Sequence, residues 1–277
     1  MLWRAGEHRL EFLETLVMGI INVTPDSFSD GGRFVDASAA VAHGLRLAAD
    51  GAGLLDVGGE STRPGAEPVS EDEELRRVIP VVRQLAAESG VPVSIDTQKP
   101  AVAKAAVAAG AAVINDIAAN RREDTLWRVA ADTGAGYIAM HMHGTPETMQ
   151  DQPEYTDVVA EVEAFFIDRL ERLAAAGVAA EQVALDPGIG FGKTVAHNLA
   201  LLANLTRFTT LGRPLVVGAS RKSFLGALTG AAVEDRLSGS LASACHAVAA
   251  GARIIRVHDV LETVRALRTT EAILKSQ

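Results

Sequence analysis

The sequence predicts an α/β protein in which eight parallel strands alternate with helices and close into a (β/α)8, or TIM, barrel. Three observations lead to this prediction. Short apolar runs recur along the chain, an Ala/Leu/Glu/Arg-rich helical pattern follows each run, and glycines stand where helices should stop. Parallel strands need helical crossovers, and eight such units in about 250 residues have the size of this barrel.

The expected strands are the runs 17–23, 53–57, 91–95, 112–117, 136–142, 182–185, 214–218 and 253–257. Helical patterns separate them, for example at 71–89, 158–176 and 238–250. We expect C-terminal glycines with positive φ at Gly51, Gly90, Gly110, Gly134, Gly177, Gly212 and Gly251. No linker divides the 277 residues, so we expect a single domain with its core over about residues 16–275. A doubly wound open sheet is the competing fold.

Composition narrows the possible partners. A net charge of −9 makes a general nucleic-acid surface improbable, so an anionic substrate would need a local cluster of basic residues. No apolar run reaches the ~18 residues of a membrane span, and the N-terminus lacks a signal-peptide core. The one cysteine, Cys245, cannot form an internal disulfide. We therefore expect a cytoplasmic protein without membrane or nucleic-acid partners.

Polar side chains stand at every expected strand end. In a TIM barrel all strands end on the same face, where active sites are built, so these residues should converge. Helix capping could explain a few Ser, Asp and Asn residues among them, but not Lys, Arg and His. The residues are Asn22, Glu60 to Arg63, Asp96, Asn115, His141 and His143, Asp186, Ser220 to Lys222, Arg256 and His258.

The last strand carries a candidate anion site. Arg256 and His258 alternate with apolar residues, so both side chains should face the barrel mouth. Asn22 and Arg63 are expected nearby, and arginine suits phosphate because its planar fork donates two parallel hydrogen bonds. The alternative is a surface arginine that pairs with Asp259 or a neighbouring glutamate.

Carboxylates at the same mouth need partners, because an unpaired buried charge is costly. Asp96, Asn115 and Asp186 could hold a metal ion, bind the N–H edge of a guanine-like ring, or only cap the following helices. The glycine-rich segment 186–194 fits neither a Walker A loop nor a dinucleotide fingerprint, because its glycines are misplaced. It more plausibly lets a flat ligand approach the backbone, with Phe191 available to cover it.

Three further features bear on the site. Lys222 could be a surface charge, a Schiff-base lysine or a donor lining the site, and its place beside Ser223 just after a strand favours the donor. The long loops 24–34 and 61–70 are typical of active-site lids. His141 and His143 lack a third ligand at zinc-like spacing, so a structural metal is not expected.

Taken together, these segments resemble the dihydropteroate synthase family of pterin-binding enzymes. The resemblance covers nearly the whole chain in order, and the set of motifs is highly specific. The matching stretches are MGIINVTPDSFSDGG (18–32), LDVGGESTRPGA (55–66), SIDTQKPAVA (94–103), INDI (114–117), MHMHGTPETMQ (140–150), LDPGIGFGKTVAHNLALL (185–202), GASRKSFLG (218–226) and RVHDVLET (256–263). The sequence departs from the family at 118–120, which bears on backbone shape there.

The resemblance implies condensation of a pterin diphosphate with 4-aminobenzoate, with Mg²⁺ as cofactor and a homodimer as the assembly. Asn22 would also ligate the Mg²⁺. The pterin ring would contact Asp96, Asn115, Ile117, Met140, Asp186, Phe191, Gly218, Lys222 and Arg256. The diphosphate would contact Asn22, Arg63, Arg256 and His258, and the residues implied in catalysis are Asp96, Lys222, Arg256 and His258. The 4-aminobenzoate side would comprise Phe28, Thr62, Arg63, Pro64, Phe191 and Ser223.

Three other functions compete with this interpretation. A methyltetrahydrofolate:corrinoid methyltransferase resembles the barrel and its pterin-binding Asp and Asn, but it needs no Arg–His diphosphate site. A non-catalytic pterin-binding homologue would have no use for the second-substrate residues Phe28, Thr62 and Arg63. A Schiff-base aldolase built on Lys222 is disfavoured because this lysine lies beyond the strand.

Overall fold

The computed structural model describes residues 1–24, 33–61, 68–119, 123–144 and 153–276, and side chains except those of 33–36. Eight parallel strands form its main sheet, in the order β8-β7-β6-β5-β4-β3-β10-β9. They are β3 (Leu16–Asn22), β4 (Leu54–Gly58), β5 (Val93–Asp96), β6 (Val113–Asp116), β7 (Gly136–Met140), β8 (Val183–Asp186), β9 (Val216–Val217) and β10 (Ile254–Val257).

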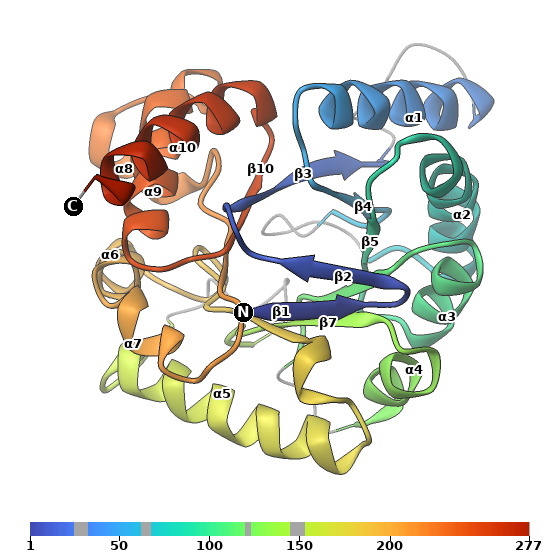
Figure 1. Cartoon of the computed structure of the whole chain (residues 1–277), viewed down its shortest axis with the longest axis horizontal. Helices are drawn as coiled ribbons and strands as arrows, with labels where there is room; N and C mark the ends of the chain where they lie inside the picture. The colour runs from blue at the N-terminus through green and yellow to red at the C-terminus, as the bar shows by residue number, and fades with distance from the viewer. Residues whose placement is uncertain (25–32, 62–67, 120–122, 145–152, 277) are drawn as a thin grey trace.

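The two outer strands of this sheet meet, which closes the barrel. Leu185 and Leu215 form a parallel bridge, and the Leu185 amide donates a hydrogen bond of 2.9 Å to the carbonyl of Pro214. Figure 1 shows the strands at the centre with the helices arranged around them. The predicted TIM barrel is therefore confirmed, and the open doubly wound sheet is excluded.

Ten α-helices of the described chain surround the strands. They are α1 (Arg33–Ala49), α2 (Glu71–Glu88), α3 (Pro100–Ala108), α4 (Thr125–Thr133), α5 (Val158–Ala175), α6 (Val195–Ala203), α7 (Leu205–Thr209), α8 (Ser223–Thr229), α9 (Leu237–Ala249) and α10 (Val260–Lys275). All seven glycines expected at helix ends have positive φ, which lets the chain turn toward the next strand. None of the helices in the described ranges is long and apolar enough to cross a membrane.

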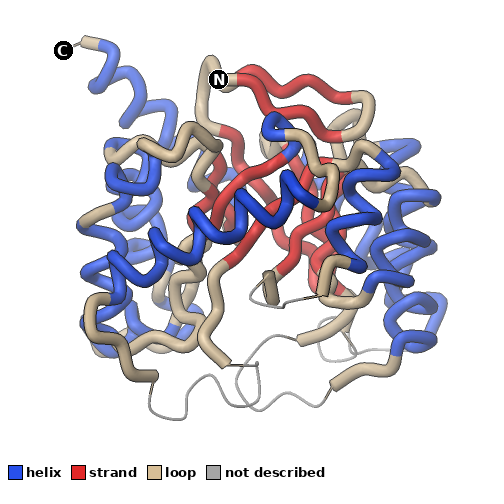
Figure 2. Tube along the Cα trace, turned by 90° about the horizontal axis from the view of Figure 1, so that it is seen from below, coloured by secondary structure: helices blue, strands red, loops and turns tan. Residues whose placement is uncertain are grey.

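An N-terminal hairpin, β1 (Leu2–Ala5) and β2 (His8–Glu11), was not predicted. Trp3 and Ala5 are fully buried against the interior residues at the start of the barrel strands, including Met18 and Ile138. The Trp3 indole donates a hydrogen bond of 2.7 Å to the carbonyl of Gln182. Figure 2 shows the hairpin at one end of the barrel, opposite the loops that follow the strands. The hairpin therefore closes the end of the barrel where the strands begin, opposite the carboxyl ends of the strands.

The interior of the barrel changes character along its axis. Side chains facing inward recur every second residue along a strand. The layer next to the hairpin is apolar and contains Met18, Leu54, Val113, Ile138, Ala184, Val216 and Ile254. Two residues further along each strand stand Ile20, Asp56, Asn115, Met140, Asp186, Gly218 and Arg256. The inward-facing side chains are therefore apolar where the strands begin and largely polar at the carboxyl ends of the strands, which form the mouth of the barrel.

Candidate active site

Six polar residues gather at this mouth and are called here the mouth cluster: Asp56, Asp96, Asn115, Asp186, Lys222 and Arg256. Strand register explains part of the convergence, because Asp96 pairs with Asn115 across β5 and β6. Asp186 and Met140 are likewise partners across β7 and β8. Lys222 follows β9 and interacts electrostatically with Arg256, Asp186 and Asp96. Residues far apart in the sequence thus meet in one place.

Arg256 joins the carboxylates of this cluster. Its Nε donates a hydrogen bond of 2.6 Å to Asp56, and its Nη2 donates one of 2.7 Å to Asp96. Asn115 donates to the same Asp56 oxygen at 3.1 Å. Arg256 is therefore no surface arginine, and the alternative pairing with Asp259 is wrong. It is Arg221 that forms the ion pair with Asp259, through Nε at 3.0 Å.

The carboxylates of the mouth cluster retain unused acceptors. One oxygen of Asp56 and one of Asp96 are buried and have no hydrogen-bond partner among the described residues. A buried acceptor without a partner costs about 1–3 kcal/mol, so a ligand with N–H donors would gain by binding here. Burial raises the pKa of Asp96 to about 7, although Arg256 opposes the shift. Burial also raises the pKa of Asp186 to about 6, against the hydrogen bond from the Gly188 amide.

Helix capping does not explain these polar residues. The helices after β5 and β8 begin at Pro100 and Val195, with Lys99 and Thr194 as their N-cap residues. The Asp186 side chain instead accepts the Gly188 amide at 2.7 Å. Capping is therefore wrong as an explanation for the two aspartates.

An apolar wall lies beside the mouth cluster. Lys222 lies against it, with Nζ 3.8 Å from the centroid of the Phe191 ring. Burial and the charge of Arg256 lower the pKa of Lys222 to about 8, although Asp186 and Asp96 oppose this shift. A flat ring could thus pack against an apolar surface and bind both hydrogen-bond donors and hydrogen-bond acceptors. The wall consists of the buried residues Ile117, Ala118, Met140, Met142 and Phe191.

The expected anion site is described in part. His258 lies just after β10, and its Nδ1 is 3.0 Å from the hydroxyl of Ser220. Burial lowers the pKa of His258 to about 4, with Arg256 adding to the effect. Asn22 is the half-buried last residue of β3. Arg63 lies outside the described residues.

Most residues expected to bind 4-aminobenzoate cannot be placed. Phe28, Thr62, Arg63 and Pro64 all lie outside the described residues. Ser223 is exposed as the first residue of α8, and Gly218 follows β9 on the inward face. Asn120 of the segment that departs from the family is also outside the described residues. The part of this side that can be placed therefore consists of Phe191 and Ser223.

Two predicted positions differ from their observed places. The strand expected at 136–142 ends at Met140, so His141 and His143 follow the strand instead of alternating along it. His141 contacts the buried Lys193, with Nδ1 3.0 Å from Nζ. Glu60, counted among the strand-end groups, forms an ion pair of 2.8 Å with Lys99, which also pairs with Glu74.

Asp56 and Lys193 were not among the predicted site residues. Asp56 lies inside β4, two residues after the inward-facing Leu54, and not at the end of the strand. Period-two alternation along that strand was the signal that could have found it. Lys193 lies in a loop, where no such periodicity exists.

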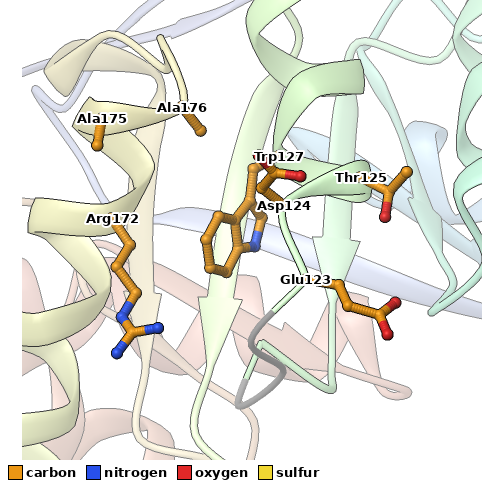
Figure 3. Close-up of a pocket in the computed structure, with 7 residues that line it drawn as sticks. All are labelled: Glu123, Asp124, Thr125, Trp127, Arg172, Ala175 and Ala176. Carbon is orange, nitrogen blue, oxygen red and sulfur yellow. The ribbon is translucent and has the colours of Figure 1, made fainter.

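A hollow of about 470 Å³ lies elsewhere, on the barrel flank between α4 and α5. Figure 3 shows the seven residues that line it, with Arg172 and Trp127 side chains from the two helices. Arg172 already pairs with Asp168, and Asp124 pairs with Arg128. None of the seven has a buried side-chain atom without a partner. This hollow therefore lacks the unsatisfied groups that mark the barrel mouth.

Comparison with known proteins places the chain in a family. Residues 18–258 match the family model described as pterin binding enzyme. The dihydropteroate synthase of Escherichia coli K12 is 51% identical over 261 residues, which cover 94% of this chain and 92% of that protein.

The chain belongs to the dihydropteroate synthase family.

Solved structures of dihydropteroate synthases extend the comparison to the fold. The Yersinia pestis enzyme in complex with a sulfonamide drug has a TM-score of 0.93 and 47% identity, over 99% of this chain and 100% of that one. The Xanthomonas albilineans enzyme with 4-aminobenzoic acid has a TM-score of 0.92 and 48% identity, with 99% of both chains covered. The family resemblance and the barrel predicted from the sequence are thus both confirmed.

Proposed function

We propose that this chain is a dihydropteroate synthase, which condenses 6-hydroxymethyl-7,8-dihydropterin diphosphate with 4-aminobenzoate to give 7,8-dihydropteroate and diphosphate. Membership of the family supports the reaction. The observation that supports it most directly in this chain is a buried oxygen of Asp96 that has no hydrogen-bond partner among the described residues and lies beside an apolar wall and a cationic Arg256. A pterin offers ring N–H donors, a flat face and, through its diphosphate, an anion.

The pterin would enter with its amino-pyrimidinone edge toward the mouth cluster. Asp96 and Asp186 accept N–H groups, while Asn115 and Lys222 can donate to ring acceptors. The free oxygen of Asp56 adds a further acceptor beside Asn115. Phe191, Met140 and Ile117 of the apolar wall would pack against the ring, and Gly218 has no side chain to obstruct it.

The leaving diphosphate would lie toward Asn22, Arg256 and His258, with Arg63 completing the set. Arginine and histidine supply donors for phosphate oxygens. The Asn22 side chain offers the hard oxygen ligand that Mg²⁺ prefers, and Mg²⁺ commonly binds through one or two protein groups plus substrate phosphates. The residues therefore fit the ion, which when bound would neutralise part of the diphosphate charge.

In the reaction, the bond between the pterin methylene carbon and the diphosphate oxygen breaks, and diphosphate leaves with the electron pair. The aniline nitrogen of 4-aminobenzoate then forms a bond to that carbon and loses a proton to solvent. This aromatic amine is neutral at pH 7, so its lone pair is available without a strong base. Asp96 stabilises the positive charge that develops on the pterin, and Arg256 and His258 stabilise the leaving group.

The second substrate would bind on the side of Ser223 and Phe191, with Phe28, Thr62, Arg63 and Pro64 contributing from the first two long loops. We further infer a cytoplasmic homodimer that associates through the last helices. Leu228 and Ile273, on α8 and α10, are 51% and 58% exposed, as an apolar interface would require. Light scattering coupled to gel filtration would give the mass of a dimer, and a monomer at micromolar concentration would contradict the inference.

A product assay tests the proposed function. The purified chain is mixed with the pterin diphosphate, 4-aminobenzoate and Mg²⁺, and both dihydropteroate and released diphosphate are quantified. We expect the two products in equal amounts. Tight pterin binding without product would indicate a non-catalytic homologue, and absence of both would contradict the proposal. A corrinoid methyltransferase would release no diphosphate.

A further inference from the structure

Lys193 is a buried lysine close to the proposed pterin site, and the mechanism above does not use it. Only 4% of its surface is exposed. Its Nζ lies 3.0 Å from His141 Nδ1, 3.3 Å from the carbonyl oxygen of His141 and 2.9 Å from that of Phe191. An ammonium group has three donors, and these three acceptors use all of them.

The burial of this charge is costly in the absence of a carboxylate partner. No described Asp or Glu oxygen lies within 4.0 Å of Nζ, so its neutral acceptors and the more distant charge of Asp186 offset only part of the lost hydration. Burial accordingly lowers the pKa of Lys193 to about 7, although Asp186 opposes the shift. An apolar side chain would avoid this cost, so the three hydrogen bonds of Lys193 must contribute something that such a side chain could not.

The bonds of Lys193 connect two backbone segments that already approach closely. A Cβ added at Gly188 would stand 1.9 Å from the carbonyl oxygen of His141, and one added at Gly192 would stand 2.7 Å from that of His143. The glycine-rich loop after β8 therefore lies directly against the chain that follows β7. Lys193 binds carbonyl groups on both sides of this contact, at His141 and Phe191.

The carbonyl held on the loop side belongs to a residue of the apolar wall. The Phe191 ring packs with Met140 and Met142 and lies 3.8 Å from the Lys222 ammonium. A shift of the Phe191 backbone would move the Phe191 ring and, with it, the Lys222 ammonium group that contacts the ring. The ammonium of Lys193 itself faces His141 and the loop carbonyls.

We propose that Lys193 is a positioning residue for pterin binding: it fixes Phe191 against the end of β7 and, through the Phe191 ring, orients Lys222. It does not need to touch the substrate. This proposal rests on the proposed function only in that the bound ligand is a pterin. A loosened contact between the two segments should weaken pterin binding without abolishing the fold.

The test is a double-mutant cycle read by calorimetry with 6-hydroxymethylpterin, which needs no turnover. Lys193→Met keeps an unbranched side chain that is one atom shorter and removes its donors. We expect it to weaken pterin binding by about tenfold, because a small misplacement of binding groups has effects of this size. Phe191→Leu should also weaken binding, and the double variant should be no weaker than Phe191→Leu, because both changes act through one ring.

Two comparisons keep the outcome interpretable. Lys193→Arg retains a cation with several donors, and we expect it to restore most of the lost affinity; it also serves if Lys193→Met does not fold. Unchanged pterin affinity in a folded Lys193→Met, or fully additive effects in the cycle, would overturn the proposal and leave Lys193 a structural residue. Failure of the wild-type product assay would refute the proposed function alone, since the cycle measures pterin binding.

Discussion

At the scale of residues, the site depends on the environment of a few buried charges. Asp96 illustrates this: one oxygen binds Arg256 at 2.7 Å, and the other is buried with no partner in the part of the chain that the structure describes. Its position at the end of a strand was predictable from the sequence, because Asp96 directly follows the apolar run 91–95. Its bond to Arg256 was not visible, because the two residues are 160 positions apart and meet only when the barrel closes.

Replacement of Asp96 tests its proposed electrostatic role. We expect Asp96→Asn to lower kcat about 100-fold, the size seen when one preorganised stabilising group is removed from an active site. The pterin Kd should rise by less than this factor, because the amide still offers an acceptor. Steady-state kinetics and calorimetry measure the two effects. Asp168→Asn, on the exposed flank of α5, is the control that should change neither. An unaltered kcat in Asp96→Asn would contradict the role.

The pH dependence of pterin binding follows from three shifted pKa values. Asp96 and Asp186, at about 7 and about 6, accept N–H groups more strongly when ionised, so affinity rises with pH until both have lost their protons. Lys222, at about 8, must keep its proton to donate with full charge, so affinity falls above that value. We expect the strongest binding between about pH 7 and 8. Calorimetry from pH 5 to pH 9 would show this maximum, and a flat profile would count against the assignment.

At the scale of elements, periodicity made the barrel predictable, whereas the hairpin and loops were not. The helices expected at 71–89, 158–176 and 238–250 end within one residue of α2, α5 and α9 at both ends. Their apolar stripes and terminal glycines give unambiguous limits. The strand expected at 214–218 is only Val216–Val217, because the barrel closes there through a single bridge at Leu215. The strands of the hairpin, LWRA and HRLE, contain charged residues and lack the continuous apolar run that marked the barrel strands.

The glycine-rich loop after β8 offers a prediction about backbone contact. Gly188→Ala should weaken pterin binding or destabilise the fold strongly, because its Cβ would overlap the His141 carbonyl oxygen. Gly230→Ala is the matched control: its φ of +73° is close to the +64° of Gly188, but nothing lies within 4 Å of its Cβ. The control should cost only the about 1–2 kcal/mol of a left-handed L-residue. Equal effects of the two changes on the free energy of unfolding and on the pterin Kd would argue against the close approach.

The N-terminal hairpin should matter for stability and not for binding. Trp3→Ala removes a fully buried indole and its hydrogen bond to Gln182, so we expect the free energy of unfolding to fall by about 3–5 kcal/mol. Urea denaturation measures this loss. Leu13→Ala, at a side chain 83% exposed, should change it by less than about 0.5 kcal/mol. The pterin Kd of folded Trp3→Ala should stay within twofold of wild type; a larger change would mean that the two barrel ends are coupled.

At the scale of the whole molecule, the parallel barrel turns residues scattered along the sequence into one site. Asp56 and Arg256 come from opposite ends of the chain, yet the ring order of the strands places β4 and β10 on either side of β3. The sequence allowed this convergence to be predicted, because all strands of such a barrel end on one face. It could not predict which charges pair in the absence of substrate, since this depends on side-chain reach across the barrel.

The convergence is tested most directly by a crystal structure of this chain with a bound pterin. We expect the ring at the barrel mouth, against Phe191 and Met140, with its N–H groups within hydrogen-bond distance of Asp96 and Asp186. The Asp96 oxygen that now lacks a partner should gain one from the ring. A pterin bound elsewhere, for instance in the flank hollow beside Trp127, would contradict the proposed site.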